Sequence, residues 1–185
     1  MADEGKDIQD LARRARAGDG TAFESIVNLY SRRIVAYCHR MAGSAAEDLA
    51  QEVFVKLYLA LPSFDTSRPL APFLFRIAHN HCLDALRRQR PRTVPLAREG
   101  EEDRHAASGP SPEDLAEGAD IGAAVAEALD SLPPPYRSVL TMRHVDGLRY
   151  EEIAQALDLP MGTVKARIHR GREMMQQKLA GHVTR

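Results

Sequence analysis

Residues 147–172, with the sequence GLRYEEIAQALDLPMGTVKARIHRGR, decide the fold of the C-terminal part of the chain. Apolar residues recur at helical spacing from Tyr150 to Leu157, the pattern stops over residues 158–162, and a second helical pattern begins at Thr163. Two short helices joined by a tight turn form a helix-turn-helix. We therefore expect this motif near the C-terminus.

The second helix of this motif, from Thr163 to about Leu179, has two chemically different sides. Its apolar stripe, which can pack on the preceding helix at Ile153, Ala154 and Leu157, consists of Val164, Ile168, Met175 and Leu179. The helix carries one acidic residue, Glu173, and five basic residues whose side chains are expected to point outward: Lys165, Arg167, Arg170, Arg172 and Lys178. A packed back and long cationic side chains suit a helix that enters the major groove of DNA. The alternative is a basic face that is merely solvated, and the helix-turn-helix context disfavours it.

The position of each cation along this helix suggests its role. Lys165, Arg167 and His169 lie nearest the helix start, where such helices meet base edges, whereas Arg170 and Arg172 are better placed for phosphates. The candidate DNA-binding residues of this motif are Thr163, Lys165, Arg167, His169, Arg170 and Arg172.

The residues before the motif predict two further helices. One covers about residues 121–132 and ends at the three prolines 133–135. The next opens at Tyr136 and ends at Gly147, a plausible left-handed stop. Its inward-facing residues are expected to be Val139, Leu140, Met142 and Val145.

The N-terminal half is also predicted to be helical. A first helix ends at residues 18–20, a second runs from Thr21 to Gly43, and a third begins near Ser44 with Glu47 at capping-box spacing. The buried stripe of the third helix is expected to be Leu49, Val53, Leu57 and Leu61. After Pro62 and a polar loop at residues 63–71, Pro72 starts a fourth helix that ends in arginines.

Between these halves, residues 90–118 hold prolines, glycines and an acidic run but few large apolar side chains. Residues 91–120 carry three Lys or Arg against eight Asp or Glu, and the flanking segments are each mildly basic. This composition predicts a flexible acidic linker. The expected fold is all-α, with two small helical domains at residues 1–90 and 121–185 joined by the linker at residues 91–120.

Composition excludes several classes of protein. Residues 1–20 contain no continuous apolar stretch, which predicts neither a signal peptide nor membrane insertion and places the protein in the cytoplasm. Cys38 and Cys82 are expected to be buried thiols, and the alternative is that one of them senses oxidation. His79, His81 and the cysteines match no zinc spacing, so no metal or other cofactor is expected. An enzyme is disfavoured because no catalytic motif is present.

Five segments together resemble a known family. Residues 132–140 (LPPPYRSVL), 147–154 (GLRYEEIA) and 162–172 (GTVKARIHRGR) closely resemble the fourth conserved region of extracytoplasmic-function sigma factors of the sigma-70 family. Residues 47–54 (EDLAQEVF) and 73–88 (FLFRIAHNHCLDALRR) resemble the second conserved region. Both matches occur in the family's order and spacing.

The resemblance implies a role for the third helix. In the family, this helix docks on the clamp helices of the largest subunit of core RNA polymerase. The acidic and amide face fits a basic protein groove better than DNA. The residues assigned to core polymerase binding are Glu47, Asp48, Gln51, Glu52 and Phe54. Without the resemblance, these acids would be an ordinary solvated face favoured by the helix dipole.

The polar loop at residues 63–71 and the fourth helix, which begins at Pro72, contain aromatic and basic side chains. Promoter melting needs such stacking surfaces and cations. By resemblance, the loop captures a flipped base of the minus 10 element and the helix follows the non-template strand. The assigned residues are Phe64, Asp65, Arg68, Phe73, Arg76, His79, Asn80, Asp84, Arg87 and Arg88. Relatives more often have Trp at the position of Phe73, and at least one of Phe64, Phe73 and Phe75 is expected to belong to the core.

The resemblance therefore predicts an alternative sigma factor that binds bacterial core RNA polymerase and promoter DNA. The C-terminal motif would recognise the minus 35 element. The resemblance also implies that an anti-sigma factor restrains the protein and that it acts in a stress or envelope response. The second hypothesis is a conventional helix-turn-helix regulator in which residues 1–118 sense a ligand or partner. The N-terminal half of the chain discriminates between the two hypotheses. A conventional regulator needs neither the polymerase-docking face at residues 48–54 nor the aromatic and basic helix at residues 73–88.

Overall fold

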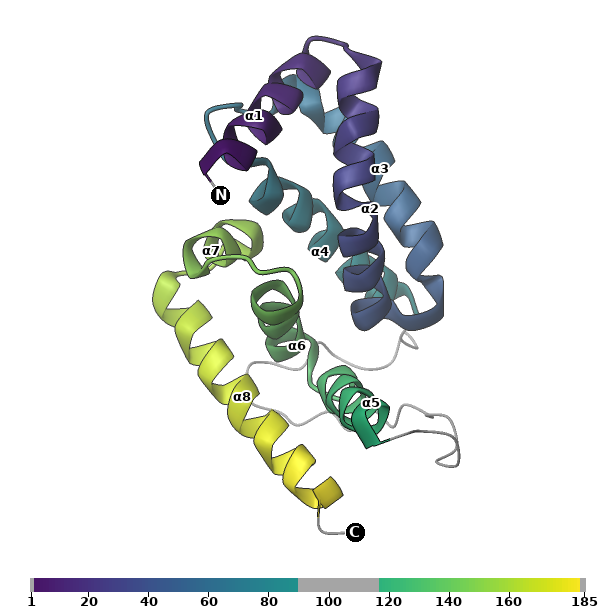
Figure 1. The fold of residues 1–185 in the computed structure, drawn as a ribbon, viewed down its shortest axis with the longest axis vertical. Coiled ribbons are helices and arrows are strands. Elements are labelled where there is room, and N and C mark those ends of the chain that lie inside the picture. The colour runs from purple at the N-terminus through teal and green to yellow at the C-terminus, as the bar shows by residue number, and fades with distance from the viewer. Residues whose placement is uncertain (1, 90–116, 184–185) are drawn as a thin grey trace.

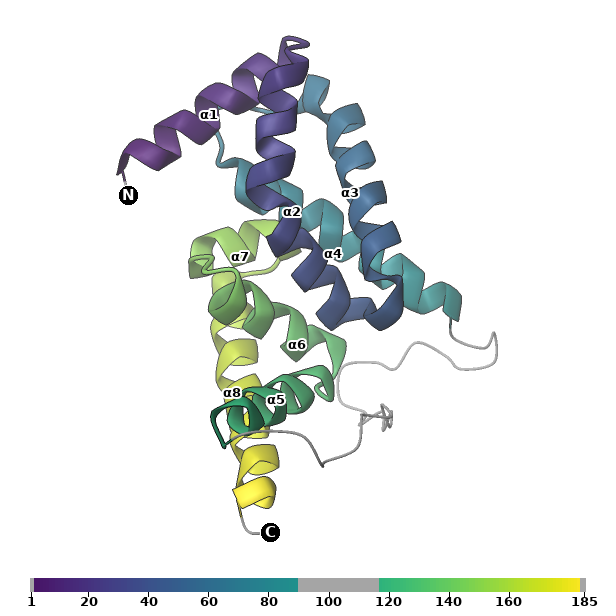
Figure 2. The same ribbon diagram turned by 45° about the vertical axis from the view of Figure 1, so that its right-hand side comes forward.

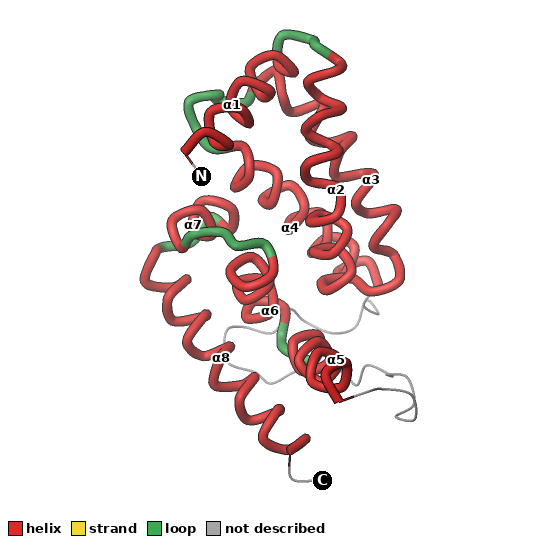
Figure 3. The backbone as a smooth tube through the Cα atoms, viewed as in Figure 1, coloured by secondary structure: helices red, strands yellow, loops and turns green. Residues whose placement is uncertain are grey.

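A computed structural model describes the backbone of residues 2–89 and 117–183, and the side chains of residues 7–88 and 122–180. Every regular element in these ranges is helical, which confirms the expected all-α fold (Figure 3). The predicted acidic linker lies largely outside the described residues. The main helices are α1 (Ala2–Arg16), α2 (Gly20–Ala42), α3 (Ala46–Ala60), α4 (Leu70–Gln89), α5 (Glu117–Asp130), α6 (Pro134–Leu140), α7 (Tyr150–Leu157) and α8 (Met161–Val183).

Helices α1–α4 form an N-terminal unit around α2, which packs against the other three. Asp19 caps the start of α2, where its carboxylate accepts hydrogen bonds from the backbone N–H groups of Thr21 and Ala22. One side of α2 is buried from end to end by Ala22, Ile26, Tyr30, Ile34, Tyr37, Cys38 and Met41. Full burial of each large apolar side chain contributes about 1.5–3 kcal/mol, so this stripe stabilises the unit.

The start of α3 differs from the prediction. Residues Gly43–Ala45 form a 3-10 turn, and α3 begins after Ala45, which makes no side-chain capping hydrogen bond. The capping box expected between Ser44 and Glu47 is therefore wrong, because Ser44 lies within the turn and outside the helix start. The predicted buried stripe is confirmed, since Leu49, Val53, Leu57 and Leu61 are all buried.

Helices α5–α8 form a C-terminal unit that contains the expected helix-turn-helix. Asp158 adopts a left-handed conformation (φ 52°) at the tight turn between α7 and α8, and Gly147 adopts one (φ 70°) before α7. Val139, Leu140 and Met142 are buried as predicted. Val145 was expected to face inward but is 46% exposed, because residues 141–145 form a π-helical turn that departs from the 3.6-residue period.

The two units contact each other. Figures 1 and 2 place α7 beside α4, and α2 also touches α5 and α6. Helix α8 runs along the outer side of the C-terminal unit and packs on α5, α6 and α7. Within the described residues, none of the helices combines the length and apolar character needed to cross a membrane.

Helix α8 approaches α6 most closely at Gly171, which is buried. A Cβ atom at this position would lie 3.0 Å from Cδ1 and 3.2 Å from Cγ of Leu140. A glycine in a helix interior lowers intrinsic helix stability by about 1 kcal/mol relative to alanine. The close approach of α8 to Leu140 therefore leaves little room for a larger side chain at position 171.

We predict that Gly171→Val destabilises the protein by about 1–3 kcal/mol, because the branched side chain overlaps Leu140 in a packed interface. Chemical denaturation monitored by circular dichroism measures the change. Gly162→Val is the matched control, since no heavy atom lies within 4 Å of a Cβ atom built there. Equal stability of the two variants would contradict the close approach.

Candidate nucleic-acid and polymerase interface

The outer face of α3 combines acids with exposed apolar side chains. Glu47 and Asp48 lie in the first turn, where the helix dipole favours them, and Gln51 and Glu52 are also exposed. Phe54 is only partly exposed and packs against the core. Four of the five assigned residues therefore form an accessible surface, and Phe54 supports it from beneath.

Sequence reasoning missed the apolar part of this surface. Val55, Tyr58 and Leu59 are 60%, 56% and 72% exposed. At 100° per residue, Val55 and Leu59 lie within about 20° of Asp48 around the helix. Residues 53–61 contain more apolar side chains than one buried helix stripe can hold. These additional apolar residues could have predicted an exposed apolar surface from the sequence.

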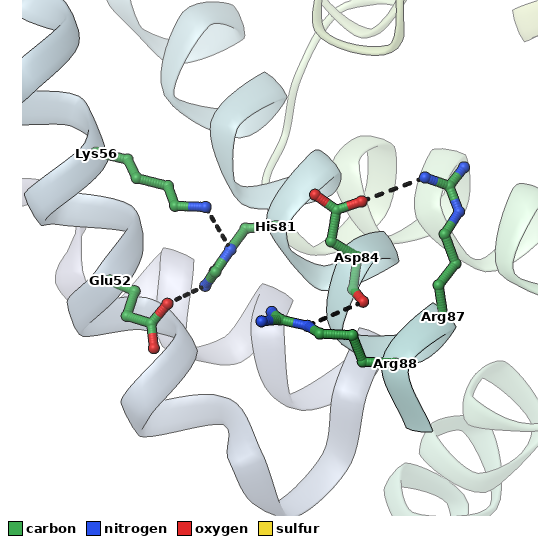
Figure 4. Close-up of a pocket in the computed structure, with 6 residues that line it drawn as sticks. All are labelled: Glu52, Lys56, His81, Asp84, Arg87 and Arg88. Atoms are coloured by element: carbon green, nitrogen blue, oxygen red, sulfur yellow. Dashed lines mark hydrogen bonds and ion pairs between the residues drawn. The ribbon is translucent and has the colours of Figure 1, made fainter. Parts of the chain in front are cut away.

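Glu52 also connects α3 to α4. Its Oε2 atom lies 2.8 Å from Nε2 of His81, and Nζ of Lys56 lies 2.7 Å from Nδ1 of the same ring (Figure 4). Burial lowers the pKa of His81, and the positive charge of Lys56 lowers it further. The neutral ring accepts from Lys56 and points its N–H toward Glu52.

These three residues line a cleft of about 450 Å³ between α3 and α4 that continues to the basic end of α4. The remaining lining residues are Asp84, Arg87 and Arg88. Asp84 holds both arginines, through a 3.2 Å ion pair with Arg87 and a 3.3 Å hydrogen bond from Arg88 to its backbone carbonyl. The cleft therefore adjoins both the docking face and the predicted minus 10 residues.

The loop before α4 is held in a defined shape. Asp65 accepts hydrogen bonds from the backbone N–H and hydroxyl of Ser67, which lower the pKa of its carboxyl group. Gln9 on α1 donates to the backbone carbonyls of Thr66 (3.3 Å) and Arg68 (2.6 Å). Sequence reasoning gave no role to Gln9, because its partners lie more than fifty residues away.

The aromatic residues divide between core and surface. Phe75 is fully buried and Phe64 is 4% exposed, so both belong to the core. Phe73 is partly exposed, with its ring centroid 4.7 Å from that of Phe64, and the guanidinium of Arg76 lies 5.2 Å from the Phe73 ring. Phe73 and Arg76 therefore supply a stacking and cationic surface at the start of α4, and Phe64 supports it.

Along α4, the polar residues assigned to the minus 10 element form an exposed row at near-helical repeats. The row consists of Arg76, Asn80, Asp84, Arg87 and Arg88. His79 lies beside this row but is half-buried, and its Nδ1 atom lies 2.9 Å from the hydroxyl of Tyr37. Burial lowers the pKa of His79 to about 4, and the charges of Arg167 and Arg87 contribute.

The cysteines and neighbouring histidines have other partners. Cys38 and Cys82 are buried free thiols, as predicted, with their sulfur atoms 3.7 Å apart. The hydrogen bond to Cys38 and burial raise the pKa of Cys82. No cluster of three potential metal ligands occurs among the residues that could be searched in the described ranges.

Helix α8 has the predicted buried apolar residues near its start and an exposed cationic surface. Val164 and Ile168 are buried, whereas Lys165, His169, Arg170 and Arg172 are exposed and Thr163 and Arg167 are half-buried. Three of these side chains form ion pairs or hydrogen bonds with neighbouring residues. Glu173 lies 3.4 Å from His169 and 3.1 Å from Arg170, and Arg172 lies 3.2 Å from a ring nitrogen of His144.

Comparison with known proteins matches both halves of the chain. Residues 26–92 match the family described as Sigma-70 region 2, and residues 122–175 match Sigma-70, region 4. The chain is 36% identical over 180 residues to the ECF RNA polymerase sigma factor SigW of Bacillus subtilis, covering 93% of this chain and 96% of SigW. The chain belongs to the extracytoplasmic-function (ECF) sigma factors of the sigma-70 family.

Other relatives agree. The ECF RNA polymerase sigma-E factor of Escherichia coli K12 is 34% identical over 178 residues, covering 92% of this chain and 93% of that protein. The structure of CnrH in complex with the cytosolic domain of CnrY matches with a TM-score of 0.72 and 25% identity, covering 95% of this chain and 98% of that chain. The predicted family is confirmed, and the region 2 match disfavours a conventional regulator with an N-terminal sensing domain.

The environment of His79 in this sigma factor gives a testable prediction. We expect its ring to titrate near pH 4 instead of its ordinary 6.5 in an NMR pH titration. Because the folded chain takes up this proton at lower pH than the unfolded chain, acidification from pH 6.5 to 4 removes stability through His79. Arg167→Ala should raise the His79 pKa, since the arginine charge opposes protonation.

Lys165→Ala is the control for this titration, because it removes one positive charge from the same helix. Its side chain does not contribute to the lowered pKa of His79. Titration of His79 near 6.5 in the unchanged protein would show that the ring is not buried as described.

Proposed function

We propose that three separate surfaces of this sigma factor divide the work of promoter recognition. The outer face of α3 binds core polymerase, the loop at residues 63–69 with α4 binds the minus 10 element, and α8 binds the minus 35 element. One observation supports this division: most residues of each assigned set are exposed, and each set lies on a different helix or on the loop before it. Sigma factors are not catalytic, so the polymerase performs the chemistry.

The α3 surface suits a protein partner better than DNA. Its acids repel phosphates, and the adjacent exposed Val55, Tyr58 and Leu59 offer apolar area that water solvates poorly. The complementary partner is a basic groove with an apolar floor. By family membership, we assign this groove to the clamp helices of the largest polymerase subunit.

The surface of the loop and α4 suits an unstacked strand. Phe73 can stack on a base, Arg76 and Arg87 can contact the backbone, and the ordered loop can hold a flipped base. Because Gln9 and Ser67 fix the loop before DNA arrives, binding does not have to order it. Phe64 acts here as the support beneath Phe73 and not as a base contact.

The α8 surface suits the major groove. Lys165 and His169 lie exposed near the start of the helix, whereas Val164 and Ile168 are buried. Glu173 orients Arg170, which is better placed for a phosphate. Each unit offers only a few phosphate contacts, so free promoter DNA binds weakly and specificity arises in the holoenzyme.

We also propose that an anti-sigma factor restrains this protein, within a stress or envelope response. CnrH, similar over 95% of this chain, was solved in complex with the cytosolic domain of CnrY. RpoE of Bartonella quintana, which shares the fold at 24% identity, was solved with the anti-sigma factor NepR. An anti-sigma factor for this chain would act by covering the α3 or α8 surface.

Transcription with purified bacterial core polymerase tests the proposed division. The core enzyme is supplied with this protein on genomic promoter fragments, and transcripts that need the protein are identified. Asp48→Ala with Gln51→Ala should abolish comigration with core polymerase. Lys165→Ala with Arg167→Ala should leave comigration intact and lower promoter-specific transcription about tenfold or more, the equivalent of one or two lost contacts.

Surface substitutions away from the proposed surfaces serve as controls. Glu24→Ala removes an exposed acid from α2, and Arg32→Ala removes an exposed cation from the same helix. Both should preserve transcription. If no transcript appears and the protein shifts a specific duplex without polymerase, the proposed division is wrong.

A further inference from the structure

The C-terminal end of α1 and the loop before α4 enclose an open cleft of about 270 Å³. Its lining residues are Arg13, Arg16 and Ala17 at the end of α1, and Thr66 in the loop. None of these lining residues is acidic, whereas two acids line the larger cleft between α3 and α4. The Sigma-70 region 2 match begins at residue 26, after α1, so that match gives the two arginines no role.

Capping of the helix end does not account for these arginine side chains. Basic residues in the last turn of a helix often compensate for its dipole or donate to its last carbonyls. In α1, the backbone N–H groups of residues 17–19 already donate to the carbonyls of Arg13, Ala15 and Arg14, at 3.0–3.1 Å. The guanidinium groups therefore stay available for another partner.

The three arginines in the last turn of α1 differ in how far they are neutralised. Nη2 of Arg14 lies 2.7 Å from the carboxylate of Asp19, the residue that caps α2. Arg13 lies 3.7 Å from Asp10, and both side chains are more than half exposed, so this ion pair contributes little. Arg16 is exposed and forms no hydrogen bond or ion pair with the side chains that the structure describes. Arg13 and Arg16 therefore present largely uncompensated positive charge to the cleft.

The position of these arginines relative to the loop is fixed. Gln9, on the same helix, donates to two backbone carbonyls of the loop. The hydrogen bonds from Ser67 and the charge of Arg68 lower the pKa of Asp65, and the charge of Arg16 lowers it further. The end of α1 and the loop thus form one ordered surface, so a ligand does not have to bring them together.

The cleft has the chemistry of a phosphate site. Guanidinium groups present paired N–H donors that match phosphate oxygens, and the hydroxyl of Thr66 can donate one more hydrogen bond. The lining residues include no aromatic ring on which a base could stack, so the cleft suits the backbone of a nucleic acid better than its bases. Thr66 lies in the loop that is proposed to hold a flipped base, which brings a backbone phosphate of the same strand within reach.

We propose that Arg13, Arg16 and Thr66 bind a backbone phosphate of the promoter strand, next to the base that the loop holds. This inference rests on the proposed function and deepens it, because it extends the strand-binding surface from the loop and α4 onto α1. A phosphate anchored beside the loop limits the positions that the neighbouring base can take. The α1 arginines therefore position the strand for base capture.

Binding of a premelted promoter by the holoenzyme tests this site. The probe is a promoter found in the transcription experiment, with a mismatched bubble over its minus 10 element. Arg13→Ala with Arg16→Ala should lower the affinity of the holoenzyme about tenfold, the equivalent of one lost contact to a charged group. The slope of log affinity against log salt should fall by about 0.7, as expected for one phosphate contact on a single strand. Arg32→Ala removes an exposed arginine from α2 and should change neither quantity.

Neutral linkages locate the contact on the strand. Each probe carries one methylphosphonate in the non-template strand of the bubble, which removes the charge of one phosphate. At one linkage, the neutral group should weaken binding of the unchanged protein and have no effect on the α1 double variant, because the same contact cannot be lost twice. A double variant that responds to every linkage as the unchanged protein does would show that the arginines bind no phosphate.

Phe73→Ala with Arg76→Ala separates this inference from the proposed function, because neither residue lines the α1 cleft. Circular dichroism checks that both double variants stay folded. Loss of affinity in the α4 variant but not in the α1 variant would overturn the α1 site and leave the proposed function standing. Loss in the α1 variant alone would support the α1 site and contradict the role assigned to α4. Unaltered affinity and salt dependence in both variants would overturn both proposals.

Discussion

Tyr37 connects the core of the N-terminal unit to the helix that is expected to meet DNA. Its ring is fully buried and packs edge-to-face on Phe75, with centroids 5.5 Å apart, and its hydroxyl meets His79 at 2.9 Å. Burial raises the pKa of Tyr37, so the hydroxyl keeps its proton and forms a hydrogen bond with Nδ1 of the His79 ring. A buried hydroxyl needs this partner. The bond adds to the burial of Leu74, Phe75 and Ala78, which turns Arg76 and Asn80 outward.

Helices α3 and α4 are joined by a second polar contact. Glu52 and Lys56 on α3 meet opposite nitrogens of His81 on α4. Glu52 and Arg88 line the same cleft as His81. The ring therefore lies between the α3 face that is proposed to bind polymerase and the basic end of α4 that is proposed to bind DNA.

Features that depend on neighbouring residues were predictable from the sequence. The buried stripe of α3, the turn before α8 and the exposed Lys165 follow from helical spacing and turn chemistry. Two local predictions were wrong where the backbone leaves the α-helical period. Ser44 lies in a 3-10 turn and Val145 in a π-helical turn, and a sequence pattern based on 3.6 residues per turn detects neither.

Contacts between distant residues were not predictable, because their side chains look like ordinary surface charges in the sequence. Arg33 and Asp146 are 113 positions apart, yet their contact joins the two units. Helical periodicity relates residues within one helix, so no pattern in residues 20–42 indicates that Arg33 meets the turn after α6. The contact, and the burial of the Asp146 carboxylate beside it, exist only in the folded chain.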